Sequence, residues 1–435
     1  MEPDLKFTLV TTELDVRNFK VSGSETSEQW IEAVTTKDPT IFYFSAFWKF
    51  DRILIISIVE RSKVTNETRC LFFYRNGSAI PQLTQGEIYL LPDFKDLRFT
   101  SSFVRCKLPV KEVPYAVALV QELSSHSIRY IPIIKQNNQI IRNFTVCVSP
   151  LFNNFNRRSE IVEMIELNRI LGAQYFFFYN YSISNGVNLI LNHYKDLGLV
   201  ETISWHLPAK IKTRNPEEIN YFAQFAAIND CLYRNKGVSQ YVVYQDMDEF
   251  IIPRKYHNWN DLMASLPRNY SIYLVRSTIF RRDWPDLDET YLTKDDLISA
   301  KKYNSLTILK QFRETRIFPK KQRTKYIAKT VCVDIADIHY VWSHRNETYC
   351  GHYYVNESLA LVHHYRDEIS YLTLKDKIWD SRINDYKSKL LDSLNKTWTI
   401  LKNVPFAGSC SHMDWTLNSS SCIILIFFVC LFDFL

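Results

Sequence analysis

Three carboxylates fall within four residues of this chain, at Asp246, Asp248 and Glu249. They directly follow Tyr241–Gln245, a nearly continuous apolar run of the kind that a central parallel strand needs. Carboxylates this close repel one another. A divalent cation that prefers hard oxygen ligands, such as Mg²⁺ or Mn²⁺, would relieve the repulsion, and a diphosphate can complete its shell. A bare Asp-X-Asp is more often an ordinary acidic turn, but its position after a buried strand favours the metal site.

The elements that would position this cluster alternate between strands and helices from Asn143 onward. Repetition of this kind builds βαβ units, and therefore a mainly parallel sheet with helices on both faces. In such sheets ligands bind outside the carboxyl ends of the strands, which is where Asp246 would lie. The pattern predicts strands at Phe144–Pro150, Tyr175–Tyr179, Leu199–Leu207 and Tyr241–Asp246, and helices at Ser159–Leu171, Val187–Leu197 and Pro216–Asn235.

A length of 435 residues is enough for two cores, and the pattern divides the chain at about residue 140. In residues 1–140 we expect a β-rich, antiparallel, sandwich-like module without a catalytic constellation. Residues 141–400 would form the α/β domain, and residues 401–435 a tail. The apolar run in that tail, Cys422–Phe432, is shorter than the ~20 residues that a membrane-spanning helix needs. The strand-like runs of the first module are Thr40–Phe47, Ile53–Val59, Cys70–Tyr74, Phe99–Leu108 and Tyr115–Leu123.

Charge and cysteine usage narrow the class of protein. The net charge of +6 is spread along the chain without a basic arm, so nucleic acid is not an expected partner. The nine cysteines form no CxxC pair, which argues against zinc-ribbon and thioredoxin sites and leaves disulfides possible. Frequent glycosylation sequons indicate the secretory lumen, although Met1–Lys6 has no signal-peptide or anchor pattern. The sequons are at Asn66, Asn76, Asn143, Asn180, Asn269, Asn346, Asn356, Asn395 and Asn418.

The segment from Cys147 to about Arg366 resembles glycosyltransferase family 92, a family of galactosyltransferases with the GT-A fold, over about half of the chain. Six short blocks in the right order carry the resemblance, and each of them alone is weak. The blocks are Cys147–Phe152, Glu166–Ala173, Asn229–Cys231, Asp246–Phe250, Lys325–Ile327 together with Ile338–His339, and His364–Arg366.

The resemblance implies a UDP-sugar donor, a glycan acceptor such as a fucosylated N-glycan, and Mn²⁺ or another divalent cation. It makes Asp248 the direct metal ligand, with Asp246 sharing the metal or holding the ribose. His364 would be a further ligand, because a neutral imidazole suits Mn²⁺. Lys325 and Arg366 would meet the phosphate oxygens.

Each of these assignments has a plainer alternative. His363 and His364 follow the apolar run Leu359–Val362, where a histidine is more often a hydrogen-bonded core residue, and the doublet leaves the register open by one position. Lys325 closes a basic run that could be a solvated face. His339 could simply end an apolar strand.

Inverting transfer needs a carboxylate base that takes the proton of the acceptor hydroxyl. Candidates lie in the segment from Asp283 to Glu289, which also holds Trp284, a residue that could stack on a sugar ring. Asp286 is slightly favoured over Asp283 and Glu289. The alternative is a polar surface loop.

Two rival functions remain open: a catalytically inactive glycan-binding or scaffold protein with the same fold, and a metal-dependent phosphohydrolase. The Asp246/Asp248 pair together with His364–Arg366 argues against the first. The second would usually show further carboxylates or histidines at other strand ends. Family 92 implies a Golgi or other secretory-pathway membrane with a luminal catalytic domain, although this sequence contains no clear anchor.

Overall fold

The computed structural model describes residues 21–23, 29–35, 40–65, 67–75, 82–93, 95–121, 128–136, 139–367 and 377–404. The apolar run Cys422–Phe432 therefore lies outside the described residues. Among the helices of the described part, none is long and apolar enough to cross a bilayer.

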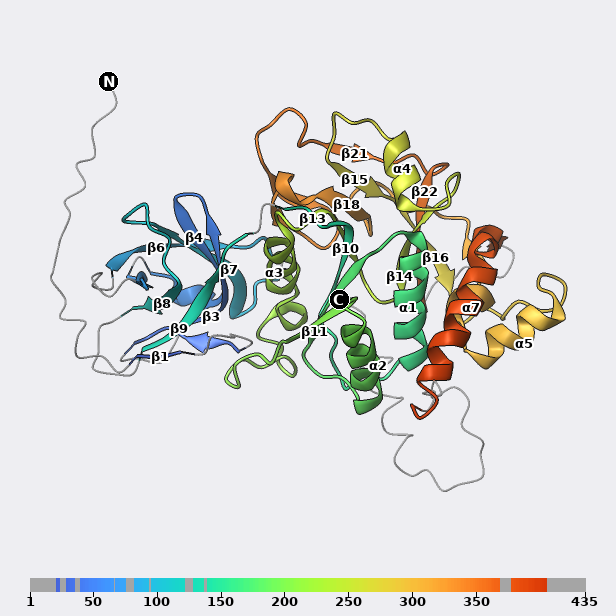
Figure 1. Cartoon of the computed structure of the whole chain (residues 1–435), viewed down its shortest axis with the longest axis horizontal. Coiled ribbons are helices and arrows are strands. Elements are labelled where there is room, and N and C mark those ends of the chain that lie inside the picture. The colour runs from blue at the N-terminus through green and yellow to red at the C-terminus, as the bar shows by residue number, and fades with distance from the viewer. Residues whose placement is uncertain are drawn as a thin grey trace.

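The amino-terminal strands form a barrel rather than a sandwich (Figure 1). They pair in the ring order β3-β4-β7-β6-β5-β8-β9, and β9 closes the ring on β3 through the pairs Ala46↔Ile133 and Phe47↔Ile134. The sandwich prediction was wrong because closure satisfies the open edges that two separate sheets would expose. The strands are β1 Val21–Gly23, β2 Ile31–Glu32, β3 Ile41–Lys49, β4 Arg52–Glu60, β5 Arg69–Phe73, β6 Gln82–Leu90, β7 Phe99–Lys107, β8 Ala116–Val120 and β9 Ile128–Ile134.

The second part of the chain is built on a seven-stranded sheet of order β12-β11-β10-β13-β18-β15-β21. Strands β10, β11, β12 and β13 run parallel to one another, and β18 runs antiparallel to β13 and β15. The prediction of a mainly parallel α/β sheet is confirmed. The strands are β10 Arg142–Val148, β11 Tyr175–Asn180, β12 Val200–Ser204, β13 Ser239–Gln245, β15 Ile272–Val275, β18 Lys325–Lys329 and β21 His352–Tyr354.

A smaller sheet of order β14-β22-β16-β17-β23 adjoins it, together with the hairpin β19–β20. Three residues separate the end of β13 from the start of β14, so the acidic cluster lies at the point where the chain passes from one sheet to the other. These strands are β14 Glu249–Pro253, β16 Ser277–Arg281, β17 Phe312–Glu314, β19 Val333–Ala336, β20 Val341–His344, β22 Ala360–Arg366 and β23 Lys377–Trp379.

Helices cover both faces of the main sheet (Figure 1). Helix α3 lies on the face toward the barrel, where Phe47 and Phe103 of the barrel pack on its Tyr233 with ring centroids 5.5 and 5.8 Å apart. Helices α1, α2 and α7 lie on the other side. The helices are α1 Arg158–Leu171, α2 Asn185–Asp196, α3 Gln224–Asn235, α4 Trp259–Ser265, α5 Lys294–Lys302, α6 Leu306–Leu309 and α7 Asn384–Ile400.

The long helix predicted at Pro216–Asn235 is wrong in its first half. Helix α3 begins only at Gln224, because Tyr221, Phe222 and Ala223 have positive φ angles of 40°, 55° and 60°. Right-handed helical backbone cannot pass through three such residues. The local apolar spacing that suggested a helix is overridden here by contacts with the barrel.

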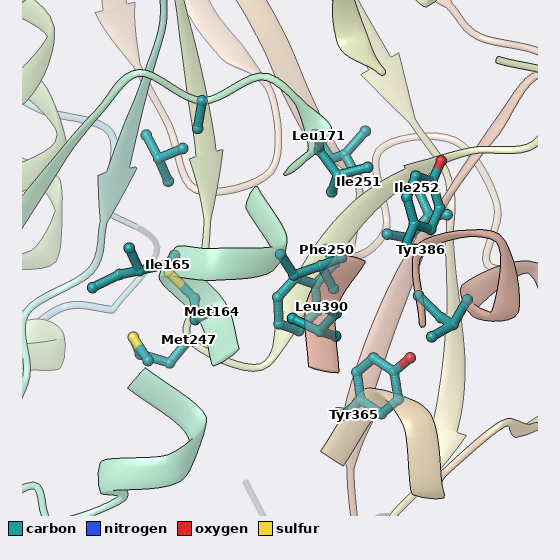
Figure 2. Packing of buried hydrophobic residues seen from close by; sticks show 14 of the residues in the cluster. Met164, Ile165, Leu171, Met247, Phe250, Ile251, Ile252, Tyr365, Tyr386 and Leu390 are labelled. Carbon is teal, nitrogen blue, oxygen red and sulfur yellow. The ribbon is translucent and has the colours of Figure 1, made fainter. Parts of the chain in front are cut away.

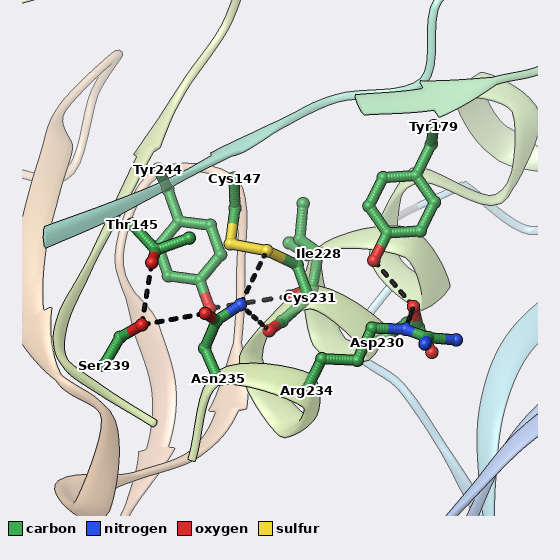
Figure 3. Close-up of a disulfide and its surroundings, with 10 residues drawn as sticks. All are labelled: Thr145, Cys147, Tyr179, Ile228, Asp230, Cys231, Arg234, Asn235, Ser239 and Tyr244. Atoms are coloured by element: carbon green, nitrogen blue, oxygen red, sulfur yellow. Dashed lines mark hydrogen bonds and ion pairs between the residues drawn. A yellow bond between two sulfur atoms is a disulfide. The ribbon is translucent and has the colours of Figure 1, made fainter. Parts of the chain in front are cut away.

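Within the described residues, three disulfides join Cys70 to Cys106, Cys147 to Cys231, and Cys332 to Cys350. The second ties β10 to α3 beside the main sheet (Figure 3). Around it, Asn235 Nδ2 donates to the Cys231 carbonyl, and Asp230 accepts hydrogen bonds from Tyr179 and Arg234. The strand and the helix that border the acidic cluster are thus covalently linked.

Candidate functional site

The acidic cluster sits at the carboxyl end of β13 with its two aspartates on the open side. Met247 between them is buried in the core beside Met164 and Ile165 (Figure 2). The side chains of Asp246 and Asp248 are 33% and 25% exposed to solvent. Burial of Met247 therefore fixes the backbone between β13 and β14, so that the carboxylates of Asp246 and Asp248 both face solvent.

Lys325 at the start of β18 joins two of the three carboxylates. Its Nζ lies 2.7 Å from Asp246 Oδ2 and 2.9 Å from Glu249 Oε2, and both Lys325 and Glu249 are buried. Burial alone would lower the pKa of Lys325, but the two carboxylates outweigh it and hold that pKa above its usual value. Burial would likewise raise the pKa of Asp246, yet Lys325 holds it below its usual range. Lys325 is therefore a permanent cation inside the cluster.

A second chain of hydrogen bonds holds the other oxygen of Asp246. Ser149 Oγ, one residue past β10, donates to Asp246 Oδ1 at 2.5 Å, and Gln224 Nε2 at the start of α3 donates to Ser149 Oγ at 2.5 Å. Residues Val148 and Gln245 are register partners on parallel strands, so Ser149 and Asp246 leave the sheet side by side. Both oxygens of Asp246 are thus positioned by the protein.

The histidine doublet separates across the two faces of β22. His364 pairs in register with Glu249, its Nδ1 lies 3.2 Å from Glu249 Oε1, and its Nε2 lies 3.8 Å from Asp248 Oδ2. His363 is fully buried and stacks on Phe280 at 4.2 Å. Because side chains alternate along a strand, only His364 faces the acidic cluster. Burial, followed by the nearby charges of Arg366 and Lys325, holds the pKa of His364 well below its usual value, so its imidazole is neutral.

Arg282 supplies positive charge beside Asp248. Its guanidinium forms a two-point ion pair with Glu160 of α1 at 2.8 and 2.9 Å and donates to the Tyr365 carbonyl. Burial raises the pKa of Asp248, and the charge of Arg282 opposes that rise. Arg366 lies at the end of β22, level with Arg281, half-buried and close enough for its charge to act on His364.

The three candidate bases occupy an exposed loop after β16. Asp283 forms a two-point ion pair with Arg281 at 2.6 and 2.7 Å, which lowers its pKa, and Asp286 pairs with Lys310 at 2.9 Å. Glu289 is exposed. Trp284 is buried in the core at 5% exposure, so the expectation that it could stack on a sugar was wrong. Arg282 directly precedes this loop, and its charge acts on Asp248 in the acidic cluster.

In the part of the chain that the structure describes, a smaller and a larger cleft lie at the carboxyl ends of the strands. The smaller is lined by Ser149, Gln224, Gln245, Asp246 and Lys325 with their apolar neighbours. The larger, about 460 Å³, lies beyond β11 and β12 and is lined by Asn180, Tyr181, Ser182, Ile183, His206 and Leu207. Since the strand order is β12-β11-β10-β13, the two clefts lie along one edge of the same sheet.

Two of the side chains around the acidic cluster, Asp248 and His364, offer atoms that can bind a divalent cation. Within the described part of the chain, no group of three or more His, Cys, Asp or Glu side chains is arranged to hold a metal ion. Asp248 and the neutral His364 nevertheless present a carboxylate oxygen and an imidazole nitrogen 3.8 Å apart, which are donors that Mn²⁺ accepts. Asp246 is less available, because Lys325 and Ser149 already engage its two oxygens.

Residues 142–402 match the family described as Glycosyltransferase family 92, which is more than half of the chain. The chain belongs to glycosyltransferase family 92. The match contains the acidic cluster, Lys325 and His364, so every residue that converges on this site belongs to the family region.

Curated relatives in family 92 match part of the chain. Beta-1,4-galactosyltransferase galt-1 of Caenorhabditis elegans is 26% identical over 185 residues, covering 39% of this chain and 42% of that protein. Another family 92 protein of the same nematode is 31% identical over 122 residues, covering 26% and 23%. The chain thus spans less than half of the length of these relatives.

One solved structure to which this chain shows a weak similarity is glucosyl-3-phosphoglycerate synthase from Mycobacterium tuberculosis in complex with Mn²⁺, UDP and glucosyl-3-phosphoglycerate. That structure has a TM-score of 0.24 at 11% identity and covers 62% of this chain and 82% of that chain. The S. aureus TarS structure has a TM-score of 0.24 at 8% identity and covers 43% and 47%. TM-scores this low do not establish a shared fold.

Some residues of the site escaped the sequence analysis. Ser149 could have been found by extending the parallel register from Asp246 to the neighbouring strand end, whereas Gln224 depends on where helix α3 begins. The role of Glu249 depends on its pairing with β22, more than a hundred residues away, which no local pattern reveals. The Arg282–Glu160 pair joins two segments that sequence alone gives no reason to connect.

Proposed function

We propose that this protein is a glycosyltransferase that moves a sugar, galactose in the first instance, from a UDP-sugar to a glycan acceptor with inversion, in a Mn²⁺-dependent GT-A type site. The observation that carries the proposal is the convergence of Asp246, Asp248, Lys325 and His364 at the carboxyl edge of the main sheet, inside the family 92 region. Similarity to beta-1,4-galactosyltransferase galt-1 supports galactose as the donor sugar. A fucosylated N-glycan is the proposed acceptor.

In this proposal the nucleotide lies along the carboxyl edge of the sheet. Neighbouring strands are ~4.8 Å apart, so the edge from β12 to β13 is long enough for a base and ribose followed by a diphosphate. The base would enter the larger cleft beside Asn180 and His206, and the ribose would approach Asp246. The diphosphate would lie near Asp248, where Lys325 and Arg366 add positive charge.

The reaction transfers the anomeric carbon from the β-phosphate oxygen of UDP to an acceptor hydroxyl. The hydroxyl oxygen attacks that carbon, its proton passes to a carboxylate, and the electron pair of the broken bond leaves on UDP. A cation held by Asp248 and His364 would neutralise charge that builds on the diphosphate. Asp286, with Asp283 and Glu289 as alternatives, is the proposed base, and a loop that moves on acceptor binding would free it from Lys310.

Synergy between metal and nucleotide tests the proposal most directly. The melting temperature of the full chain should rise more with Mn²⁺ and UDP together than the separate shifts add up to, because a cation that bridges protein and diphosphate links the two affinities. Ligand at 100 times its dissociation constant adds about 2.7 kcal/mol of stability. Additive shifts would reject the transferase proposal and favour a silent scaffold. A positive result would lead to a screen of UDP-sugars against a glycan array.

The two histidines offer a matched test of the metal ligand. His364→Ala should weaken Mn²⁺-dependent UDP binding by at least about tenfold, since it removes a donor atom from the site. His363→Phe should leave that binding within about twofold, because His363 packs on Phe280 behind the strand. Isothermal titration of UDP with and without Mn²⁺ would measure both. Equal losses in the two variants would contradict the assignment of His364.

The proposed address is the lumen of the secretory pathway, with attachment to a Golgi membrane as in the family. Six cysteines paired as disulfides support an oxidising compartment.

If the protein enters the secretory lumen, its exposed sequons should carry N-glycans. Asn269, Asn346 and Asn356 are exposed on loops, whereas Asn180 lines the larger cleft. In protein secreted from eukaryotic cells we expect N-glycans on the first three and none on Asn180, because a glycan there would fill the cleft. Enzymatic deglycosylation in ¹⁸O water followed by peptide mass spectrometry would mark each occupied asparagine. Absence of glycans at all three exposed sites would contradict the luminal address.

A further inference from the structure

A left-handed turn of three consecutive residues precedes helix α3. Tyr221, Phe222 and Ala223 have φ and ψ angles near +40° to +60°, and none of them is glycine. Residues with a Cβ rarely adopt this conformation, and a run of three persists only where the surroundings enforce it. The turn therefore identifies a segment whose geometry is imposed by its contacts.

On one side, this turn contacts the residues of the proposed donor site. Phe222 stacks on Phe152 at 4.3 Å and packs on Tyr181 at 4.6 Å, and these two residues follow the ends of β10 and β11. The Phe222 carbonyl accepts a hydrogen bond from Trp205 Nε1 at 2.9 Å. Gln224, the first residue after the turn, donates to Ser149, which in turn holds Asp246. The turn thus supports both the wall of the larger cleft and the first aspartate.

On the other side, the barrel loop between β6 and β7 holds the residues that lead into the turn. Arg98 pairs with Glu218 at 3.0 Å, and the Phe99 amide donates to the Glu218 carbonyl at 2.8 Å. Two further contacts come from the same loop. Lys95 pairs with Glu217 at 3.2 Å and lies 5.6 Å from the Tyr221 ring centre, and Asp93 accepts from Asn220 Nδ2 at 3.0 Å.

We propose that Asp93, Lys95, Arg98 and Phe99 of the barrel loop form a positioning element of the donor site, which holds the left-handed turn and thereby sets Phe222 and Gln224 for nucleotide binding. The proposal deepens the proposed function and rests on it for the identity of the ligand. The loop acts through the turn and does not touch the donor itself. The barrel would then contribute to nucleotide binding by the transferase domain, rather than acting as an independent module.

The ion pairs of Lys95 and Arg98 are expected to position the turn without adding much to the stability of the whole protein. The side chains of Lys95 and Arg98 are 46% and 42% exposed, and ion pairs at such exposure add little to the free energy of unfolding. Their effect on the turn is different, because they act on a segment whose backbone conformation is unfavourable on its own. Losing them would let the turn relax while the two cores stay folded.

The test compares two double variants of the full chain, each neutral in net charge. Asp93→Ala with Lys95→Ala removes the contacts to Asn220, Glu217 and the Tyr221 ring. The matched control, Glu87→Ala with Arg105→Ala, removes a cross-strand barrel pair whose charged atoms lie 4.0 Å apart and which does not contact the turn. Isothermal titration with UDP and Mn²⁺ gives the affinity, and hydrogen exchange of peptides covering 149–155 and 217–226 gives the local order.

The Asp93→Ala/Lys95→Ala double variant (the seam variant) should bind UDP about three- to tenfold more weakly than wild type, as expected for the loss of two exposed contacts, with an unchanged melting temperature. Its hydrogen exchange should be faster in both peptides, and the control should match wild type in both measurements. Unchanged exchange in the seam variant would overturn the proposal, as would unchanged UDP affinity. If wild type binds no UDP, the proposed function fails, and the exchange data alone still decide whether the loop orders the turn.

Discussion

Replacing Asp248 with asparagine is expected to lower sugar transfer by at least about 100-fold and to abolish Mn²⁺-dependent UDP binding, because the change removes the charge that faces the cation and keeps the side-chain shape. The free energy of unfolding should stay the same or rise. Burial raises the pKa of Asp248, so the folded state disfavours its ionised form more than the unfolded state does. At neutral pH a neutral amide removes that cost.

Transfer would be measured as UDP release in the presence of acceptor, binding by isothermal titration, and stability by chemical unfolding. Asp392→Asn is the matched control, since Asp392 is exposed and lies on α7, which carries none of the residues of the acidic cluster, and all three quantities should equal those of wild type. A variant that keeps transfer would show that Asp248 is not a ligand. A variant that loses its fold would point to a structural role for the carboxylate.

The sequence predicted the placement of the acidic cluster well, because that placement follows from two local rules. An apolar run long enough for a buried strand predicts β13, and strand-helix alternation predicts that its carboxyl end lies at the ligand-binding edge. Neither rule requires knowledge of distant pairing. Both therefore hold for Asp246 and Asp248 without a structure.

The features that sequence could not supply depend on contacts between distant segments. The choice between His363 and His364 needed the register of β22 on β14, which brings His364 opposite Glu249. The false helical start at Pro216 followed from local spacing, and the barrel contacts at Glu217 and Glu218 overrode it. Closure of the barrel likewise depends on a pair of strands, β3 and β9, that are far apart in the chain.

The proposed base illustrates a further limit. Asp283 and Asp286 share a loop with Glu289, and each of the two aspartates is paired with a cation in this conformation. Residue types alone favoured Asp286 only slightly over Asp283 and Glu289. The ion pairs separate them, since Asp283 is held at two points by Arg281 whereas Asp286 has one partner, which favours Asp286 as the group that is more readily released.

Removing the cation inside the cluster should have the largest effect on folding. Lys325→Met would leave Asp246 and Glu249 without their shared partner, and Glu249 is buried at 1% side-chain exposure. Breaking a buried ion pair by removing one member costs about 3–5 kcal/mol, because an uncompensated charge stays in the interior. We expect a loss of that size in the free energy of unfolding, measured by urea or guanidinium titration.

A double variant distinguishes the lost charge from lost packing. Glu249→Gln in the Lys325→Met background should recover part of the stability, since the pKa of Glu249 is raised to about 8 by burial and an amide stays neutral without taking up a proton. The defect of Lys325→Met should also shrink as the pH falls from 7.5 to 5.5. Burial raises the pKa of Glu249 to about 8 even with Lys325 present, and loss of the lysine also releases the pKa of Asp246 from its lowered value. The folded variant therefore takes up protons more readily as the pH falls. A defect that is independent of pH and of Glu249→Gln would instead mean that Lys325 acts through the packing of its methylene chain.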